Sequence, residues 1–321
     1  EAAERSLRAV LRQQPDQPDA LHILSVILCQ TRRFEAAIHQ LKQLVALAPE
    51  FAEGWRNLGA AFQEQGDFEA AIASYQQALK LDPHQADVHQ NLSAVWLEVD
   101  QPFAAVTHAE RLVALKPDAA EAHYNLGYAL RRAGQVQAAI ASYRQAIALN
   151  PDMATAHKNL GHALLLTGDF TNGFQEIEWR WQQPGWSRRP FTQPEWDGSD
   201  LTDKTILLFA EQGLGDTLQF IRYVPLVKAK GGTVIVECQP ELVSLLAQRP
   251  DIDRLIPQDA PLPPFDVQAP LMSLPRILGT SVTTVPVEIP YLKAAGSGQQ
   301  ADGNHSPTHL LHPLTPPAAL K

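Results

Sequence analysis

A short turn around residue 214 carries the residue types best suited to bind a ligand. Gly213 and Gly215 lack side chains, so the backbone there can approach a ligand closely. A helical stretch follows from Thr217, and the start of a helix offers free N–H groups to a phosphate. Asp216 stands where the helix dipole stabilises a carboxylate, and it can also cap the helix through the backbone of the next residues. The turn therefore predicts either a phosphate-binding loop or a simple strand-to-helix connection.

The same turn argues against a nicotinamide cofactor. The dinucleotide-binding fingerprint needs a third glycine three residues after the second, and Leu218 stands there. Glu237 does follow the turn by about 20 residues, where such a fold places a ribose-binding acid. A dehydrogenase domain is therefore a minor alternative, and we expect no bound cofactor.

Four asparagines recur at one spacing in the first half of the chain. Asn57, Asn91, Asn125 and Asn159 are each separated from the next by 34 residues. A side-chain amide both donates and accepts hydrogen bonds, so a row of amides can bind the backbone of an extended peptide. Each such bond contributes about 0.5–1.5 kcal/mol. The alternative is that each asparagine bonds locally, within its own part of the fold.

Three histidines share another column of the same period. His89, His123 and His157 align with Trp55. Metal ligands must converge on one point, whereas these histidines occur once per period. The column therefore predicts rings that replace Trp55 in packing, and we expect no metal site.

The period itself indicates a helical repeat. One column contains only proline: Pro15, Pro49, Pro83, Pro117 and Pro151. Two further columns contain only small residues: Ser25, Gly59, Ser93, Gly127 and Gly161, and Ala37, Ala71, Ala105, Ala139 and Gly173. Apolar residues spaced by three and four describe two amphipathic helices per repeat, and the small columns are expected where those helices cross most closely. Glycines at positions 66, 134 and 168 mark turns between the helices.

In residues 52–85 the pattern Trp55, Leu58, Gly59, Phe62, Ala71, Tyr75 and Pro83 resembles the tetratricopeptide repeat. The pattern predicts an α-solenoid at residues 1–183, with repeats at 18–51, 52–85, 86–119, 120–153 and 154–183. An unpaired helix before them suggests that further repeats precede it. The first helices should form the inner face of the array. These repeats also resemble those attached to protein O-linked N-acetylglucosamine transferases, which implies that the asparagine row contacts a peptide.

The composition changes after the repeats. Seven of the 25 prolines lie in residues 1–183 and eighteen in residues 184–321. A tryptophan-rich connector at 184–203 should help to cover the end of the array, together with the last helix. The side chains expected to cluster there are Phe174, Ile177, Trp179, Trp181, Trp186 and Trp196. From residue 204, apolar runs at 205–210, 233–237, 254–256 and 265–267 alternate with helical stretches. This alternation predicts a parallel sheet, a Rossmann-like half, at 204–292.

The stretch EQGLGDTLQFIRYVPLV, followed by ECQPELVSLL, FDVQAPLMSLPRILGT and VEIPYL, resembles a glycosyltransferase-like region that follows tetratricopeptide repeats in a group of bacterial proteins. Its Gly-Leu-Gly-Asp turn is similar to that of lipopolysaccharide heptosyltransferases, which are of the GT-B type with two Rossmann-like lobes. The resemblance implies that Asp216 is the catalytic base on an acceptor hydroxyl, in a loop with Gly213 and Gly215. Arg222 and Ser273 are then further substrate-side candidates, and the donor is a nucleotide sugar.

No second lobe is recognisable after residue 292. Residues 293–321 are rich in Gly, Ser, Pro and His without a helical or strand period, so a disordered tail is expected. Its histidines, His305, His309 and His312, are spaced only loosely like metal ligands. A two-lobed enzyme of this type binds its donor mainly with the second lobe. We therefore expect inefficient transfer by this chain, through truncation or a reading-frame error.

Two functions follow from these patterns. One is a repeat scaffold coupled to a glycosyltransferase-like domain that acts on a protein or glycan acceptor, and the other is a purely protein-binding scaffold. A formal net charge of -9 argues against a nucleic-acid partner, because phosphate binding needs clustered Lys and Arg. No apolar run is long enough to span a bilayer. The only two cysteines, Cys29 and Cys238, predict buried free thiols in a cytoplasmic protein.

Overall fold

A computed structural model describes residues 2–211 and 213–292, which form two compact units. The first unit extends to Thr192 and also contains Ser273–Val285. The second contains Gln193–Met272 and resumes at Pro286. The boundary expected near residue 183 thus lies later, and the lobe expected at 204–292 is interrupted by a segment of the first unit. The predicted tail at 293–321 lies outside the described residues.

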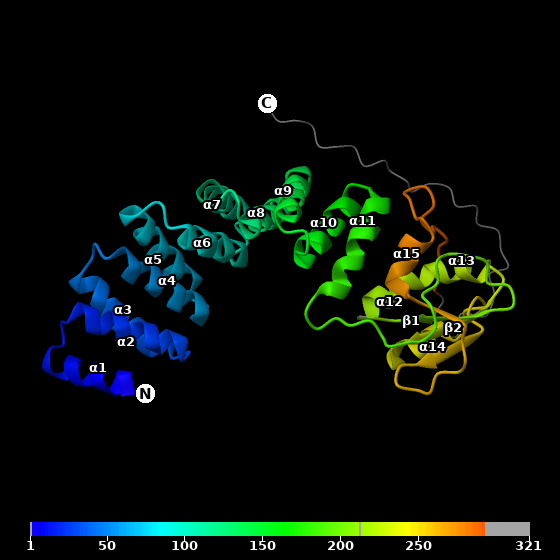
Figure 1. Ribbon diagram of the computed structural model, residues 1–321, viewed down its shortest axis with the longest axis horizontal. Coiled ribbons are helices and arrows are strands. Elements are labelled where there is room, and N and C mark those ends of the chain that lie inside the picture. The colour runs from blue at the N-terminus through cyan, green and yellow to red at the C-terminus, as the bar shows by residue number, and fades with distance from the viewer. Residues whose placement is uncertain (1, 212, 293–321) are drawn as a thin grey trace, which may run out of the picture. The chain divides into compact units, whose positions relative to one another are not determined.

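Helical hairpins in series build the first unit (Figure 1). A single helix, α1, spans Ala2–Gln13 and precedes five hairpins. The first helices of the hairpins are α2 Pro18–Gln30, α4 Ala52–Gln65, α6 Ala86–Glu98, α8 Ala120–Arg132 and α10 Ala154–Leu166. The second helices are α3 Phe34–Leu47, α5 Phe68–Leu81, α7 Pro102–Leu115, α9 Val136–Leu149 and α11 Phe170–Ile177. Consecutive first helices touch one another, and the predicted solenoid of hairpins is confirmed.

The turn inside every hairpin contains one residue in the left-handed conformation. Gly66, Gly134 and Gly168 have φ angles of 81°, 75° and 83°. Arg32 and Asp100 hold the same place in the other two hairpins, with φ angles of 56° and 54°. This backbone conformation costs energy for residues that have a side chain, so they adopt it rarely. Glycine does not have this cost. The turn position therefore repeats in all five hairpins, although glycine marks only three of them.

The small columns let the two helices of each hairpin approach closely. Their alanines are completely buried: Ala37, Ala71, Ala105 and Ala139. A Cβ atom added at Gly59 would lie 2.6 Å from the ring of Tyr75, and one at Gly127 would lie 2.7 Å from the ring of Tyr143. Both tyrosine rings are fully buried in the space that the glycines leave. The expected role of the small residues is thereby confirmed.

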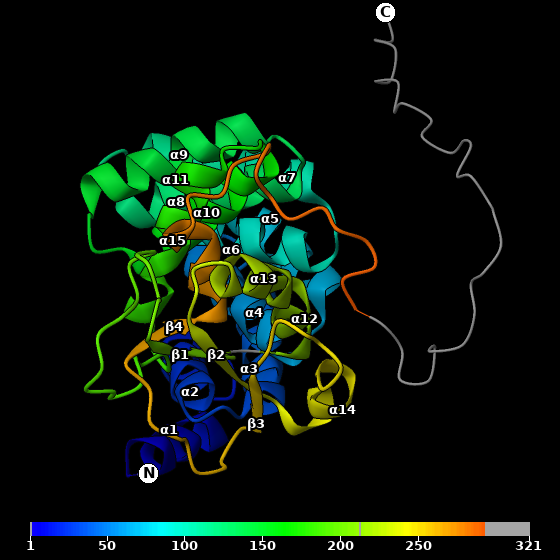
Figure 2. The same ribbon diagram turned by 90° about the vertical axis from the view of Figure 1, so that its right-hand side faces the viewer.

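The second unit contains a four-stranded parallel sheet (Figure 2). Its strands are β1 Thr205–Phe209, β2 Thr233–Cys238, β3 Arg254–Pro257 and β4 Val267–Pro270. They lie in the order β3-β2-β1-β4, with Leu207 opposite Ile235 on one side and Gln268 on the other. The main connecting helices are α12 Leu214–Phe220, α13 Val224–Lys228 and α14 Val243–Leu246. The parallel sheet is as predicted, but 3-10 turns make the helices shorter than the expected stretches 217–230 and 240–248.

The segment Ser273–Val285 returns to the hairpins and contributes α15, Leu274–Ile277. Ser273 Oγ donates to Glu178 Oε1 at 2.9 Å and accepts from the Arg180 guanidinium at 2.8 Å. Arg180 is only 1% exposed, and it also donates to Glu178 at 2.7 Å. A guanidinium that is buried to this extent needs a carboxylate and polar groups as hydrogen-bond partners. The returning segment therefore forms part of the cover at the last hairpin, where α15 contacts α11.

Three of the junction tryptophans belong to the same cover. Trp179 stacks on His157 with ring centroids 3.8 Å apart, and Trp181 meets Trp186 edge-on at 5.9 Å. Trp196 instead lies buried in the second unit, where its Nε1 donates to the Ser199 carbonyl at 3.0 Å. The expected cluster of aromatic side chains is therefore divided between the two units.

Candidate functional site

The four predicted asparagines lie on consecutive first helices and are all partly buried. We call the array formed by α2, α4, α6, α8 and α10 the first-helix row. The Nδ2 atom of Asn57 lies 3.2 Å from Nε2 of His22 on the preceding first helix. Asn91 acts on the Tyr75 hydroxyl, on the second helix of the preceding hairpin, and partly offsets the rise that burial causes in the pKa of Tyr75. Asn57 thus contacts a neighbouring hairpin directly, which is the local role that the sequence left open.

The other two amides differ from each other. Asn159 donates to the Thr155 carbonyl at 2.9 Å and to the Tyr124 hydroxyl at 3.4 Å. Asn125 makes no hydrogen bond to another residue within the described ranges. An amide has two donors and an acceptor oxygen, so one or two local bonds leave capacity for a ligand. Some hydrogen-bonding groups of the four amides are therefore used within the fold, and others are available to a ligand.

The ring column has one structural role in four hairpins. Each ring nitrogen faces the carbonyl of the proline six residues earlier. The pairs are Trp55–Pro49, His89–Pro83, His123–Pro117 and His157–Pro151, at 2.8, 3.2, 2.7 and 2.9 Å. The histidines therefore occupy the place of Trp55 and fasten the loop between repeats. Among residues 2–211 and 213–292, no three potential ligand side chains form a metal-binding group.

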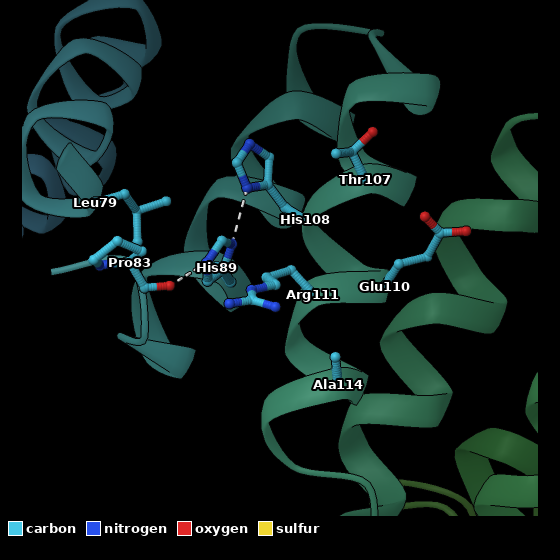
Figure 3. A pocket seen from close by; sticks show the side chains of 8 residues that line it. All are labelled: Leu79, Pro83, His89, Thr107, His108, Glu110, Arg111 and Ala114. Carbon is cyan, nitrogen blue, oxygen red and sulfur yellow. Dashed lines mark hydrogen bonds between the residues drawn. The ribbon is translucent and has the colours of Figure 1, made fainter.

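A groove of about 460 Å³ lies beside this column, next to α5, α6 and α7 (Figure 3). It is lined by Leu79, Pro83, His89, Thr107, His108, Glu110, Arg111 and Ala114. Nδ1 of His89 lies 3.1 Å from Nδ1 of His108. Because Nε2 of His89 faces a carbonyl, we assign its proton there, so Nδ1 of His89 accepts from His108. This arrangement needs a neutral His89 ring and a proton on Nδ1 of His108.

Burial is the main reason why both rings stay neutral. It lowers the pKa of His108 to about 4, with a smaller contribution from His89. Burial also lowers the pKa of His89. The contact with the Pro83 carbonyl opposes this shift, and the charge of Arg111 adds to it. The groove therefore contains an uncharged imidazole pair at neutral pH, in which His89 is buried and His108 is partly buried. His108 was not singled out in the sequence, because its column contains different residue types.

The column that contains His108 lies 19 residues after the column of Trp55, His89, His123 and His157. His108 follows His89 by this spacing, and Glu176 follows His157. Nδ1 of His157 lies 2.5 Å from a carboxylate oxygen of Glu176. Both ring nitrogens of His157 thus face oxygen atoms, one of the Glu176 carboxylate and one of the Pro151 carbonyl. The pairing of the two columns is the sequence signal that would have found His108.

The glycine loop of the second unit is open. Gly213 and Gly215 are exposed, and a Cβ atom added to either would meet no atom of the described residues within 4 Å. Gly213 is the N-cap of α12, and Asp216 is the third residue of that helix rather than its cap. The alternative in which Asp216 caps the helix is therefore wrong. Its carboxylate still lies in the first turn, where the helix dipole stabilises negative charge.

The remaining two candidates, Arg222 and Ser273, have other partners in the structure. The Arg222 guanidinium lies over the ring of Tyr291 at 4.3 Å and donates to the Pro286 carbonyl at 3.4 Å. Arg222 therefore holds the chain segment that resumes at Pro286. Ser273 is completely buried in the first unit with Arg180, so the two substrate-side candidates do not belong to one compact unit.

Two segments match family models for the repeat. Residues 52–85 match the model described as tetratricopeptide repeat, and residues 127–168 match the model described as TPR repeat. The hairpins of the first unit are thus tetratricopeptide repeats, as the sequence predicted. No curated protein matches the chain.

Several solved structures resemble the repeat array. YrrB, described as a TPR protein with an unusual peptide-binding site, is 17% identical, with a TM-score of 0.50 over 56% of this chain and 93% of that chain. MamA from Desulfovibrio magneticus RS-1 is 24% identical, with a TM-score of 0.49 over 52% of this chain and 97% of that chain. PilF from Pseudomonas aeruginosa is 20% identical, with a TM-score of 0.47 over 53% of this chain and 78% of that chain. The likeness to YrrB supports the fold of the array.

No helix within the described part of the chain has the length and apolar character needed to cross a membrane.

Proposed function

We propose that this protein is an interaction scaffold whose first-helix row binds an extended peptide. The observation that carries the proposal is the set of four amides, placed once per hairpin on helices that touch one another. Second helices pack mainly against first helices, so the first helices lie closer together and form the inner side of the curve. An extended peptide lying along this row would meet one amide per repeat. YrrB, which has a similar fold, is described as having a peptide-binding site.

Asn125 offers the sharpest test, because its amide has no bond to another described residue to lose. We expect Asn125→Ala to leave the melting temperature unchanged and to weaken the binding of an extended peptide. The double variant Asn91→Ala/Asn125→Ala should weaken it by about tenfold, equivalent to about 1.4 kcal/mol for two lost hydrogen bonds. Fluorescence anisotropy with labelled peptides measures both effects.

A matched control replaces two amides on second helices. Gln76 on α5 and Gln145 on α9 are exposed and lie outside the row. The variant Gln76→Ala/Gln145→Ala should bind as the unchanged protein does. Equal affinities of the two double variants would contradict the proposed role of the row.

A second candidate function concerns the glycine loop, for which we propose binding of a nucleotide sugar and glycosyl transfer with Asp216 as base. The loop follows β1, which has β2 on one side and β4 on the other. In parallel α/β sheets, ligands bind beyond the carboxyl ends of the strands where the order reverses in this way. This placement, with the open space at both glycines, favours a ligand there.

The test is incubation of the whole chain with nucleotide sugars, followed by measurement of hydrolysis or acceptor labelling. Turnover that is lost in Asp216→Asn and kept in the nearby control Gln219→Ala would support the assignment. Binding without turnover would leave a nucleotide-binding platform. The absence of both would leave the scaffold as the sole function.

The two unpaired cysteines suit a reducing compartment, and we propose the cytoplasm as the site of action.

A further inference from the structure

His89 and His108 place two imidazole nitrogens within reach of one ion. His89 belongs to α6 and His108 to α7, and their Nδ1 atoms lie 3.1 Å apart beside the groove (Figure 3). Two nitrogens that bind one ion at about 2.0–2.1 Å each lie about 2.9–3.4 Å from one another, for bond angles between roughly 90° and 110°. The two helices therefore hold the nitrogens at the separation that a shared metal ion requires.

Binding of an ion needs a turn of each ring. The ring centroids are 5.3 Å apart, and the ring planes form an angle of 38°. An ion held by both nitrogens lies to one side of the line that joins them, so the rings must turn toward it. The second torsion of a histidine side chain is broad, so this turn is accessible. The groove of about 460 Å³ beside the rings leaves space for the ion and for water molecules that complete its coordination.

The surroundings of His89 suit a metal ligand. Its Nε2 atom lies 3.2 Å from the Pro83 carbonyl, which fixes the proton there and leaves the lone pair of Nδ1 toward His108. Histidines that bind metals commonly donate their other N–H to a backbone carbonyl in this way. A histidine binds a metal as the neutral ring, and burial lowers the pKa of both histidines. Neither ring therefore has to lose a net proton at neutral pH.

The third hairpin is distinguished from the other four by this pair. The residues that take the place of His108 in the other hairpins are Gln40, Ser74, Ser142 and Glu176. In the last hairpin, His157 faces Glu176, but Trp179 stacks on the His157 ring at 3.8 Å. Trp179 stands in the column of Arg111, which lines the groove in the third hairpin. Two histidines beside a groove therefore come together at one place in the array.

We propose that His89 and His108 bind one divalent transition metal ion through the Nδ1 atom of each ring. On binding, the Nδ1 proton of His108 moves to its Nε2, so both rings stay neutral and each donates one lone pair to the ion. Imidazole ligands suit Zn²⁺, Ni²⁺ and Cu²⁺, and water molecules fill the remaining positions. The site does not involve convergence of the column His89, His123 and His157, and it is independent of the asparagine row.

Isothermal titration calorimetry of the full chain with Zn²⁺ or Ni²⁺ alone tests the site. His108→Ser should weaken binding by at least about tenfold, because the loss even of a group that only orients a ligand usually costs that much. Serine stands at this place in two other hairpins, as Ser74 and Ser142, so the repeat accommodates it. The bound ion should also raise the melting temperature of the unchanged protein, and this rise should vanish in the variant.

A second variant removes the other ligand while keeping its structural contact. In His89→Trp the indole can still donate to the Pro83 carbonyl, as Trp55 does to Pro49 at 2.8 Å. This variant should also weaken binding by at least about tenfold. The matched control is His123→Trp, the same substitution in the next hairpin, where Ser142 stands in place of the second histidine. The control should bind the ion as the unchanged protein does.

Arg111 gives a test in the opposite direction. Its positive charge acts on His89, and it lines the same groove, so it opposes a bound cation. Arg111→Gln introduces the residue that other hairpins have in this column, Gln43, Gln77 and Gln145. The variant should bind the ion about threefold more tightly at low salt, and the gain should shrink at high salt.

The outcomes decide the assignment. Equal affinities of the unchanged protein, His108→Ser and His89→Trp, with unchanged melting curves, would overturn it, as would the absence of binding with both ions. His305, His309 and His312 offer a competing explanation, because they also carry imidazoles. If replacing these three by glutamine abolishes binding while His108→Ser keeps it, the ion belongs to them and the proposed site is wrong.

Discussion

Two pairs of glycines, one pair in each unit of this protein, have opposite surroundings. In the repeat array, Gly59 and Gly127 lie against buried tyrosine rings at distances that leave no room for another carbon atom. In the sheet unit, Gly213 and Gly215 face open space. Packing explains the first pair completely, whereas nothing within 4 Å explains the second pair. The comparison teaches that Gly59 and Gly127 report a close contact between two helices, whereas Gly213 and Gly215 leave room for a ligand.

The largest expected effect comes from filling the space against a tyrosine ring. Gly59→Val should lower the free energy of unfolding of the array by at least about 2 kcal/mol, because the buried Tyr75 ring must move. Urea denaturation followed by the circular dichroism of the helices measures this. A loss below about 0.5 kcal/mol, the usual effect of a surface substitution, would contradict the packing role.

The histidine pair of the groove should make the array sensitive to acid. The pKa of His108 is lowered from 6.5 to about 4, so below pH 6.5 the unfolded chain binds a proton that the folded chain excludes. Stability is therefore present above that pH and is lost as the pH falls toward 4. The loss should approach about 1.4 kcal/mol per pH unit at most.

Two variants check this pH dependence. His108→Gln removes the titrating ring and should flatten the dependence between pH 6.5 and 4, whatever it does to stability at neutral pH. His84→Gln, at an exposed histidine, should leave it unchanged. Equal slopes in the two variants would show that the buried pair does not control acid stability.

The smallest effect is expected in the glycine loop. Gly213→Ala should change the stability of the second unit by no more than about 0.5 kcal/mol, since the added carbon meets no neighbour and the φ of -65° suits alanine. Thermal melting followed by tryptophan fluorescence measures it. A loss as large as that expected for Gly59→Val would show that the glycine serves folding rather than a ligand.

Prediction from sequence succeeded where contacts repeat within one period. The spacing of small residues located the close helix contacts, and the alignment of three histidines with Trp55 located the rings that replace it in three further hairpins. The left-handed turns at Arg32 and Asp100 were not predicted, because the hairpin rather than the residue type imposes their backbone conformation. The pairing of His89 with His108 was not predicted, because the column that contains His108 varies in residue type.

The candidate site was less predictable, because charge pairing depends on neighbours. Ser273 was grouped with the glycine loop, yet it belongs to the first unit, where its hydroxyl bonds Glu178 and Arg180. A contact between residues more than 90 positions apart leaves no periodic signal in the sequence.

By itself the sequence determined the hairpin array, the positions where its helices touch, and the parallel arrangement of the later strands. Those features follow from short-range periodicity, which steric fit and the burial of apolar side chains translate directly into structure. The tertiary structure alone decided where the first unit ends and that Ser273–Val285 rejoins it. Such choices depend on burial and charge partners that are brought together only when distant parts of the chain pack.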